Sequence, residues 1–446
     1  MLAEQWSCLS RLGIRGFGHR VQCALVVILG LLIVKVVLGK NRIQQKKRFN
    51  GKPVVGLFNP YCSAGGGGER VLWCAVRSIQ IQYPGFQIVV YTGDRVPTET
   101  MLQNAKQKIN VEIREGNLEF ITIRSRQLVE ATNYPHFTLI GQSLGSMVLG
   151  MEAICKLVPD IFIDTVGYSF TFPIFRYLGG CKIACYVHYP TISTDMLSKI
   201  ASGTTAFNNS SFISKSSILT QLKSVYYHLF AWLYGVMGRR ADVVMVYPPC
   251  DVKEFAELSV DPDPKCLRII VVAQFRPEKD HPLMIRSFHK LFDFLTDEEK
   301  KRVKLVLVGK DLKVNDHIDF HVNVAFDELK SLMEESTIGI HAMWNEHFGS
   351  GIVECMAAGL IMVAHKSGGP MMDIVTGSDG AQPVGFLASD ESEYAKIICR
   401  IIRMSADERE RIREAARNHV TRFSDDAFQS EYINIVSPLV DNFTIK

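Results

Sequence analysis

Residues 53–80 read PVVGLFNPYCSAGGGGERVLWCAVRSIQ, a pattern that indicates a strand, a glycine-rich turn and a helix. Four consecutive glycines let the backbone approach a ligand closely, and the helix N-terminus that follows favours an anion. The turn is not a P-loop, because no Gly-Lys-Ser/Thr follows, and Arg70 takes the place of the third glycine of the dinucleotide fingerprint. We therefore predict a ligand-binding strand–turn–helix unit that uses Gly66 and Gly67.

The same alternation continues along the chain. A helix is expected at 143–157, and apolar strands are expected at 87–93, 118–123, 136–140, 160–166 and 182–190. The pattern then restarts, with helices between strands expected at 267–275, 303–310, 337–343 and 360–369. Apolar strands alternating with helices are typical of a parallel sheet covered on both faces. The predicted fold class is therefore α/β, with two doubly wound halves joined near Val246 to Val252.

Composition supports two domains and argues against nucleic acid as a partner. The chain has 446 residues, 47% of them apolar, and a net charge of only +4, so anion recognition must be local. Its eleven cysteines are scattered without Cys-x-x-Cys spacing. That pattern favours buried thiols in a reducing compartment over a disulfide framework or a zinc site.

An apolar segment near the N-terminus predicts a membrane anchor. Val21 to Leu38 is long enough to span a bilayer, and its one charge, Lys35, lies near the end where it can snorkel. Three cations precede the segment and six follow it, which places the C-terminal side in the cytoplasm. We expect a lumenal tail at 1–20, an anchor at 21–39 and a basic linker at 40–52.

A second apolar segment allows two interpretations. Residues 218–237 read ILTQLKSVYYHLFAWLYGVM, rich in aromatic residues and poor in charge. This composition suits a helix in a membrane interface near 218–238, and it suits equally a buried helix packed between domains. The upstream anchor favours membrane contact.

The stretch Gly141-Gln142-Ser143-Leu144-Gly145 matches the nucleophile elbow of serine hydrolases. The match is short, and no downstream Asp and His stand out as its partners. A tight turn from strand to helix is therefore the favoured explanation.

Polar residues also follow predicted strands, where open α/β sheets bind ligands. His188 follows the strand at 182–187, although a lone histidine is usually structural. Arg276 and Lys279 follow the strand at 267–275, and two cations at a strand end suit a diphosphate. The alternative is a solvated turn.

The stretch NEHFGSGIVECMAAG, Asn345 to Gly359, places Glu346 and Glu354 around a glycine-rich turn. If Gly351 caps the following helix, Glu354 lies in the first turn and stabilises the helix dipole. That leaves Glu346 and the turn unexplained. In the alternative, the free backbone N–H groups and both carboxylates face a nucleotide sugar.

The motifs GGGGERVLW, YVHYP, YPPCDV, QFRPEKDHPL, MWNEHFGSGIVECMAAG and AHKSGGP resemble the retaining glycosyltransferases of family four, whose signature is Glu, seven residues, Glu. Within that family they resemble the GDP-mannose-dependent α-1,2-mannosyltransferases of asparagine-linked glycosylation, from about Val54 to Phe423. The resemblance implies a GT-B architecture of two Rossmann-like domains facing a cleft. Residues 53–246 would bind the lipid-linked acceptor and 247–446 the donor, with a helix at Ala406 to Val420 or beyond crossing back.

The resemblance also implies roles for individual residues. Glu346 and His188 would be catalytic, with Glu346 at the mannose. Arg276 and Lys279 would hold the diphosphate and Glu354 the ribose. The full set of substrate-binding residues would be Arg276, Lys279, Glu354, His347, Phe348, Gly349, Gly66, Gly67 and Gly369.

The implied partners are GDP-mannose, a dolichol-pyrophosphate-linked oligosaccharide, the endoplasmic reticulum membrane and other mannosyltransferases of the pathway. No cofactor or metal is expected, because two cations can take the leaving charge and no Asp-x-Asp triplet is present. The implied reaction adds the fourth and fifth mannoses on the cytoplasmic face, with retention of configuration.

The chain departs from the family pattern in two places. A helix and a strand are expected between Val246 and Tyr247, and a helix is expected between Lys310 and the strand near Val322, where only residues 311–320 are present. These departures leave open that the chain is a non-catalytic membrane scaffold with a degenerate transferase fold. A second alternative is the transfer of mannose to another lipid acceptor, which the Glu-x7-Glu signature alone does not distinguish.

Overall fold

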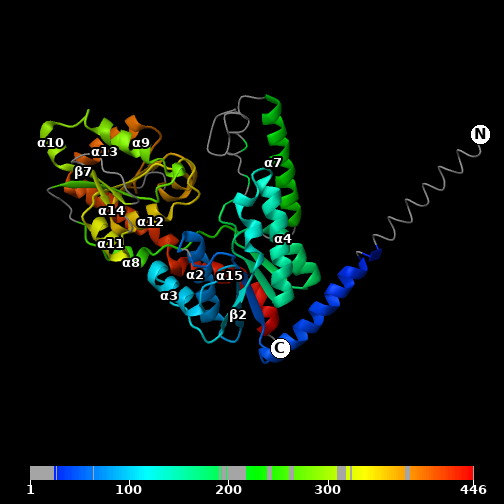
Figure 1. The fold of residues 1–446 in the computed structure, drawn as a ribbon. Coiled ribbons are helices and arrows are strands. Elements are labelled where there is room, and N and C mark those ends of the chain that lie inside the picture. The colour runs from blue at the N-terminus through cyan, green and yellow to red at the C-terminus, as the bar shows by residue number, and fades with distance from the viewer. Residues whose placement is uncertain are drawn as a thin grey trace, which may run out of the picture.

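The protein has two parallel sheets, each covered by helices on both faces, in a computed structural model (Figure 1). The structure describes residues 25–26, 28–63, 65–189, 192, 197, 217–238, 244–260, 266–308, 318–321, 324–376 and 382–444. This arrangement confirms the predicted α/β class and its two doubly wound halves.

The N-terminal sheet has five parallel strands in the order β3-β2-β1-β4-β5. The strands are β1 (Val54–Phe58), β2 (Gln87–Thr92), β3 (Leu118–Thr122), β4 (Ile161–Asp164) and β5 (Lys182–Cys185). Because β1 lies between β2 and β4, the strand order reverses beside it, and the glycine turn follows this strand. Ligands of open α/β sheets bind at such a reversal.

Different helices cover the two faces of this sheet. One apolar core joins it to α2 (Gly67–Gln82), α3 (Thr98–Ile109) and the last helix, α15 (Asp425–Thr444). The other face packs against α4 (Thr138–Lys156), and the buried side chain of Leu38 joins that core from the N-terminal helix. Short turns complete this half: η1 (Ser125–Val129), η2 (Ala131–Asn133), η3 (Ser169–Thr171) and η4 (Ile174–Leu178).

The C-terminal sheet has six strands in the order β11-β10-β9-β6-β7-β8, all parallel. They are β6 (Leu267–Val272), β7 (Val303–Val308), β8 (Ile318–His321), β9 (Ile338–His341), β10 (Ile361–His365) and β11 (Phe386–Ala388). The strand order again reverses beside the first strand of the half, β6. Both sheets therefore place a reversal at the carboxyl end of their first strand.

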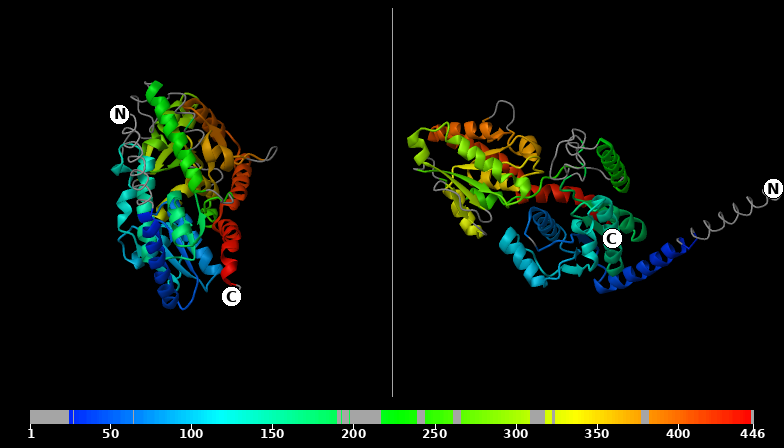
Figure 2. Two further views of the ribbon diagram at one scale, coloured as in Figure 1. Left: turned by 90° about the vertical axis from the view of Figure 1, so that its right-hand side faces the viewer. Right: turned by 45° about the horizontal axis from the view of Figure 1, so that its top comes forward.

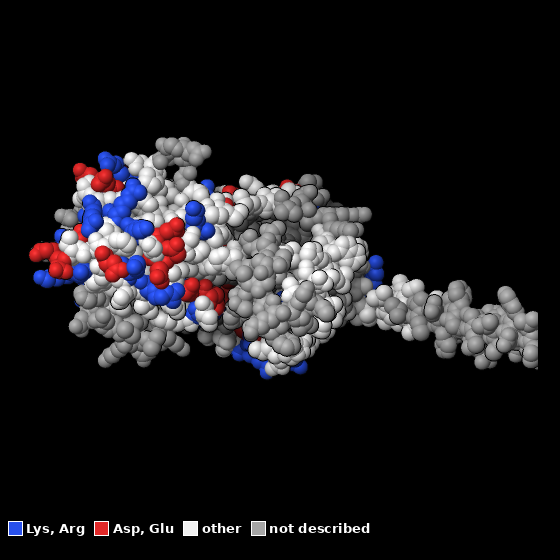
Figure 3. Space-filling model, turned by 90° about the horizontal axis from the view of Figure 1, so that it is seen from above, with Lys and Arg blue, Asp and Glu red and all other residues white. Residues whose placement is uncertain are grey.

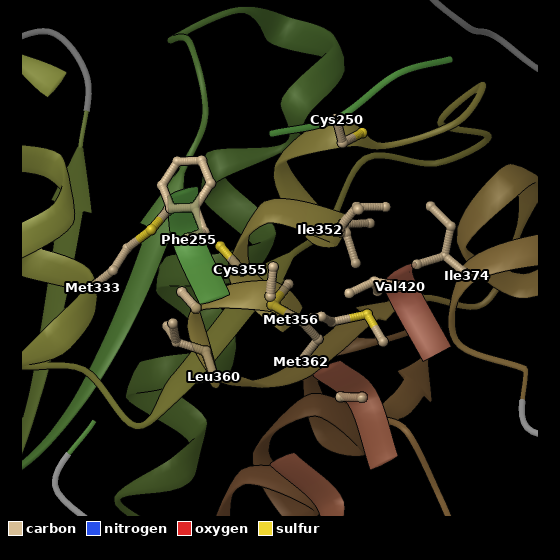
Figure 4. Packing of buried hydrophobic residues seen from close by; sticks show 14 of the residues in the cluster. Cys250, Phe255, Met333, Ile352, Cys355, Met356, Leu360, Met362, Ile374 and Val420 are labelled. Atoms are coloured by element: carbon tan, nitrogen blue, oxygen red, sulfur yellow. The ribbon is translucent and has the colours of Figure 1, made fainter. Parts of the chain in front are cut away.

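Helices cover both faces of the C-terminal sheet. On one face α12 (Ser350–Ala358) is almost enclosed, and its Ile352, Cys355 and Met356 lie among residues from β10 and from the neighbouring helices (Figure 4). The remaining elements are α8 (Val252–Ala256), η5 (Pro277–Lys279), α9 (His281–Leu291), α10 (Asp297–Lys301), α11 (Phe326–Glu334), η6 (Pro370–Ile374), α13 (Glu391–Ile402), α14 (Ala406–Val420) and η7 (Thr421–Phe423).

The chain passes between the halves at two adjacent places. Residues 246–251 run from the N-terminal half to α8, and residues 423–425 lead back into α15, which packs on α2. The crossings touch, because Cys250 forms a parallel bridge with Ser424 and its N–H donates to the carbonyl of Phe423 at 2.9 Å. The returning helix is thus α15, the segment after Ala406 to Val420.

Two local predictions were wrong. Residues 136–140 form no strand, because Phe137 has left-handed backbone and α4 begins at Thr138. A short apolar run cannot be told from the start of a buried helix by its pattern. The GQSLG stretch therefore lies inside α4, where it is neither a nucleophile elbow nor a turn, and Gly145 packs against Leu128.

The helix cap at the glutamate pair was also placed wrongly. Gly349, with φ of 103°, caps α12, and Gly351 is already helical. Glu354 therefore lies beyond the first turn, where the helix dipole offers little stabilisation. Stabilisation of the helix dipole therefore explains the presence of Glu354 less well.

Both departures from the family pattern fall at unusual connections. Residues 244–249 form no strand before the first crossing. β7 ends at Val308 and β8 begins at Ile318, which leaves fewer residues than the dozen or more of an ordinary parallel crossover. Those intervening residues, 309–317, lie outside the described residues.

The predicted anchor lies only partly within the described residues. Residues 28–48 are helical, and their apolar side chains up to Val37 are exposed except for Val34, which packs partly against the N-terminal core; residues 21–24 and 27 are not described. Within the described parts of the chain, one helix, Thr138–Lys156, is long and apolar enough to cross a membrane. That helix is α4, which packs on the N-terminal sheet.

Candidate active site

A partly buried ion cluster lies at the strand ends of the C-terminal sheet. Glu346 follows β9, and its Oε2 lies 2.5 Å from Lys279 Nζ and 3.1 Å from His341 Nε2. Lys279 comes from η5, just after β6, so two neighbouring strands bring these groups together. The predicted proximity of Lys279 and Glu346 at neighbouring strand ends is therefore present. His341 was missed, because its position inside an apolar strand gave no signal.

The cluster keeps Glu346 ionised. Burial alone would raise the pKa of its carboxyl, but the hydrogen bond from His341 and the charge of Lys279 outweigh burial and lower the pKa to about 2. At neutral pH this side chain can accept hydrogen bonds but cannot donate a proton.

Glycines let two loops meet beside Glu346. The Gly369 N–H donates to the Glu346 carbonyl at 2.8 Å, and a Cβ on Gly369 would lie 2.6 Å from the His347 carbonyl oxygen. Gly368 adopts φ of 56°, where a side chain is strained. These glycines fix the backbone of residues 345–348 through close contact.

Phe348 anchors this loop from below. Its ring lies 5.2 Å from that of Phe423 and 6.0 Å from that of Tyr247, at the edge of the C-terminal core. Phe348 and Gly349 were both predicted to bind substrate. Because the Phe348 ring packs against this core, the two residues offer a ligand their backbone groups. The packing of Phe348 explains why an aromatic residue occupies this glycine-rich turn.

One aromatic contact joins the two halves at the site. The rings of Tyr189 and His347 stack with centroids 3.6 Å apart and planes 2° apart. Asn345 Nδ2 also donates to the Tyr189 hydroxyl at 3.1 Å. Tyr189 belongs to the YVHYP motif of the N-terminal half. Its position next to His188 in this motif was the only feature of the sequence that pointed to a role for Tyr189.

His188 lies on the N-terminal side, near the start of α2. Its Nε2 lies 2.9 Å from the Thr165 carbonyl, and a Cβ on Gly68 would lie 3.5 Å from the same nitrogen. Because a carbonyl only accepts, Nε2 carries the proton and Nδ1 remains an acceptor. Loss of hydration lowers the pKa of His188, although the Thr165 hydrogen bond opposes this, so the ring is neutral at pH 7.

The glycine run forms the N-terminus of α2. Gly66 is the N-cap residue, and its N–H donates to the Glu69 carboxylate three residues later. A Cβ on Gly67 would meet nothing within 4 Å, so this residue faces open space. Gly68, which was not predicted, is the member of the run that lies beside His188.

Arg276 does not join the ion cluster. Its side chain is exposed, and its guanidinium is 3.9 Å from Glu278. The two predicted diphosphate ligands therefore differ in this structure, because Lys279 is paired with Glu346 whereas Arg276 is exposed.

Glu354 lies in a second electrostatic environment. Burial raises the pKa of its carboxyl to about 7, the nearby Arg70 opposes the rise, and Asp251 adds to it. Arg70 belongs to α2 and Asp251 to the first crossing, so Glu354 faces the junction of the two halves. Among the described residues, no group of three or more His, Cys, Asp or Glu forms a metal-binding arrangement.

Family comparison matches most of the chain. The family described as "ALG11 mannosyltransferase N-terminus" matches residues 52–248, and that described as "Glycosyl transferases group 1" matches residues 253–419. Among solved structures, the sucrose-phosphate synthase of Thermosynechococcus elongatus covers 88% of this chain and is covered fully by it, with a TM-score of 0.59 and 13% identity. A glycosyltransferase of Rickettsia africae matches 88% of this chain over 99% of its own length, with a TM-score of 0.56 and 17% identity. These similarities establish the GT-B fold alone.

Curated relatives are much closer in sequence. A Homo sapiens protein named "GDP-Man:Man(3)GlcNAc(2)-PP-Dol alpha-1,2-mannosyltransferase" is 44% identical across 94% of this chain and 93% of its own length. A Dictyostelium discoideum protein of the same name is 42% identical across 87% of this chain and 85% of its own. The human alignment spans 461 positions but only part of the 446 residues here, so that relative has segments that this chain lacks. The chain is therefore a glycosyltransferase that belongs to the GDP-mannose-dependent α-1,2-mannosyltransferase family.

Proposed function

We propose that this protein transfers mannose from GDP-mannose, in α-1,2 linkage, to dolichol-pyrophosphate-linked Man3GlcNAc2 and then to Man4GlcNAc2. The names of the relatives support this donor and the first of these acceptors. The structural observation that carries the proposal is the partly buried Lys279–Glu346 pair, at the point where Tyr189 of the other half meets the same loop.

Donor binding would redistribute the charges of this cluster. A diphosphate approaching Lys279 competes with Glu346 for the ammonium group, and Arg276 is exposed and able to turn toward the same phosphate. Once released, the Glu346 carboxylate accepts hydrogen bonds from mannose hydroxyls. Donor binding would therefore separate the pair, with Lys279 at the diphosphate and Glu346 at the mannose.

The leaving diphosphate sets the barrier of the reaction. Negative charge grows on the departing phosphate while positive charge grows on the mannose ring. Lys279 and Arg276 would stabilise the first, and the ionised Glu346 would stabilise the second, by several kcal/mol in a site shielded from water. In this proposal the side-chain cations neutralise the phosphate without a metal, and the donor and product are both α-linked.

The acceptor would approach from the N-terminal half. Nδ1 of His188 is an unprotonated acceptor, and Gly67 next to it faces open space. We propose that His188 orients a sugar hydroxyl at the reacting centre, whereas the N–H groups at the start of α2 bind negatively charged oxygens.

Sizing of reaction products tests the proposed function. Microsomes that contain this chain would be incubated with GDP-mannose and short dolichol-linked oligosaccharides. We expect products one and two mannoses longer, and we expect Glu346→Gln to abolish them. Equal transfer by Glu346→Gln and the parent would contradict the assignment of Glu346.

The same assay separates the two alternatives. Transfer to another lipid but not to dolichol-linked Man3GlcNAc2 would identify a different acceptor. No transfer by the parent would favour the non-catalytic scaffold, for which the two short connections are the specific observation.

We propose further that the protein sits on the cytoplasmic face of the endoplasmic reticulum membrane. α7 (Ser217–Met237) packs one face on its own half, with Phe230 buried against Phe170, and does not lie between the halves. Its opposite face and that of α4 are apolar and exposed, and both lie on the side of the N-terminal helix (Figures 1 and 2). The exposed residues are Leu144, Met147, Val148, Leu222, Val225, Leu229 and Trp232.

The distribution of charge agrees with this placement. Seen from above, charged side chains gather on the C-terminal half, while the described surface of the N-terminal half is largely uncharged (Figure 3). An exposed apolar patch of this kind marks a membrane or protein contact. Residues 209–211 and 442–444 match the Asn-x-Ser/Thr motif for N-linked glycosylation. The cytoplasmic placement predicts that Asn209 and Asn442 carry no glycan, and a glycan on either residue would overturn this placement.

A further inference from the structure

Arg70 contacts both places where the chain crosses between the halves. Its Nη2 lies 2.8 Å from Asp425 Oδ2 at the second crossing and 3.7 Å from Asp251 Oδ2 at the first. Its Nε and Nη2 also donate to Asp425 Oδ1 at 3.3 and 3.0 Å. One guanidinium from α2 therefore spans both crossings, which are themselves joined by the bridge between Cys250 and Ser424.

The environment of Arg70 makes this contact strong. The side chain is 10% exposed, and its Nη1 donates to the carbonyl of Ile109 at 2.5 Å, which holds the guanidinium on its own half. Asn110, the next residue, donates to Asp251 at 3.0 Å and reinforces the same junction. A buried, bidentate arginine pair fixes geometry more tightly than an exposed lysine pair can.

Arg70 also acts on Glu354 from the side of α2. Besides burial, the charges of Arg70 and of Asp251 at the first crossing act on the pKa of Glu354. Burial and the charge of Glu354 in turn raise the pKa of Cys250 at the first crossing and of Cys355, the neighbour of Glu354 on α12. Arg70 is the only cation in this set. The junction and Glu354 therefore share one positive charge, and its residue, Arg70, lies three positions after Gly67.

We propose that Arg70 is a positioning residue for the transfer reaction: it clamps both crossings onto α2 and so sets where Glu354 stands relative to the glycine turn. This role rests on the proposed function, with Glu354 at the donor ribose as the family resemblance implies, and with the N–H groups at the start of α2 binding negatively charged oxygens across from it. A loosened clamp would let the two binding surfaces separate, which weakens donor binding.

Four variants separate geometry from charge. Arg70→Lys keeps the cation beside Glu354 but loses the fork that grips Asp425, and Arg70→Gln loses both. Asp425→Asn releases the clamp while Arg70 stays in place, so it serves if the Arg70 variants fail to fold. Lys253→Gln is the matched control, because Lys253 pairs with Asp426 beside the same junction but both side chains are largely exposed.

The measurements are KM and kcat for GDP-mannose, and GDP affinity by titration calorimetry between pH 6 and 8.5. We expect KM to rise about tenfold or more in Arg70→Lys, Arg70→Gln and Asp425→Asn, with a smaller change in kcat and none in Lys253→Gln. Arg70 opposes the rise of the Glu354 pKa to about 7, so the loss of its charge should raise this pKa further. Only Arg70→Gln loses the charge, so only this variant should move the acidic limb of GDP binding to higher pH.

A lower unfolding temperature with unchanged KM, GDP affinity and pH profile would show that Arg70 is merely structural, and this would overturn the proposal. Unchanged GDP binding in Asp425→Asn would overturn it as well. A parent protein that binds no GDP would instead refute the proposed function, so the two failures are distinguishable.

Discussion

The two glutamates of the Glu-x7-Glu pair are held in opposite states. Glu346 is paired with Lys279 and His341, and its pKa falls to about 2, whereas burial raises the pKa of Glu354 to about 7. The spacing of the two glutamates in the sequence does not predict this difference. The partners that create it come from β9, η5, α2 and the first crossing.

Glu346→Gln should destabilise the protein in a pH-dependent way. The folded-state pKa lies below the ordinary 4.5, so the ion cluster contributes stability above about pH 4.5 and loses it as the pH falls toward 2. That depression corresponds to roughly 3 kcal/mol at neutral pH. Urea unfolding of the solubilised protein should show a large loss at pH 7 and a smaller one at pH 4.

The exposed pair between Glu112 and Lys106 provides the control for this comparison. Glu112→Gln should leave the urea midpoint unchanged at both pH values. A Glu346→Gln effect of equal size at pH 7 and pH 4 would contradict the assignment of the low pKa.

Tyr189→Leu should weaken donor binding without unfolding either half. The substitution removes the stack on His347, worth about 0.5–1.5 kcal/mol, and frees the loop that carries Glu346. We expect KM for GDP-mannose to rise about two- to tenfold. Tyr189→Phe keeps the ring and loses only the hydroxyl contact to Asn345, so it should fall between Tyr189→Leu and the parent.

Residue types at strand ends could be predicted from the sequence, but their partners could not. Lys279 and Glu346 stood out because they follow apolar strands, at the edge where open α/β sheets bind ligands. His341 and Tyr189 carried no such mark, because a histidine in an apolar strand and a tyrosine after one are usually structural. Arg70 was read only as a break in a glycine motif.

At the scale of elements, α4 depends on a backbone contact that only glycine permits. A Cβ on Gly145 would lie 1.9 Å from the Leu128 carbonyl oxygen, and neither backbone can give way easily. In α7, by contrast, a Cβ on Gly235 would meet nothing within 4 Å. The two helices therefore tolerate the same substitution very differently.

Gly145→Ala should cost about 1–3 kcal/mol of folding stability through overpacking. Gly235→Ala should be neutral or slightly stabilising, because alanine is the better helix former. Thermal unfolding of both variants checks the pair, and equal midpoints would contradict the close approach of α4 to η1.

Long periodic elements were predictable, and the boundaries at α4 and α12 were not. Most strands of both sheets, and the helices α2, α4, α9, α11 and α12, follow from apolar runs and spacing. The helices α3 and α13 and the edge strand β11 were not predicted. The error at 136–140 arose because a helix whose first turn is apolar looks like a strand. The error at α12 arose because Gly349 and Gly351 are equally good caps in sequence, and only the backbone at Gly349 is left-handed.

At the scale of the whole molecule, the last helix belongs to the first half. Phe428, Tyr432, Val436 and Val440 of α15 lie in the core that also contains α2 and β1. The C-terminal segment thus completes a core that begins near residue 55, so the N-terminal half lacks part of its core until α15 packs on it.

Phe428→Ala should therefore destabilise the N-terminal half by about 3–5 kcal/mol, although the residue lies near the C-terminus. Hydrogen exchange should show the loss of protection in β1 and α2 rather than in the C-terminal sheet. Ser430→Ala, at an exposed position on the same helix, is the control. Lost protection confined to the C-terminal sheet would contradict this packing.

The paired crossings also constrain how the enzyme moves during turnover. Because both connections run side by side at Cys250 and Ser424, we expect the two halves to move by rotation about this junction rather than by sliding. The stack between Tyr189 and His347 joins the halves at another place, so a rotation that frees spent nucleotide should part these rings. The rate of product release should consequently track the strength of one aromatic pair.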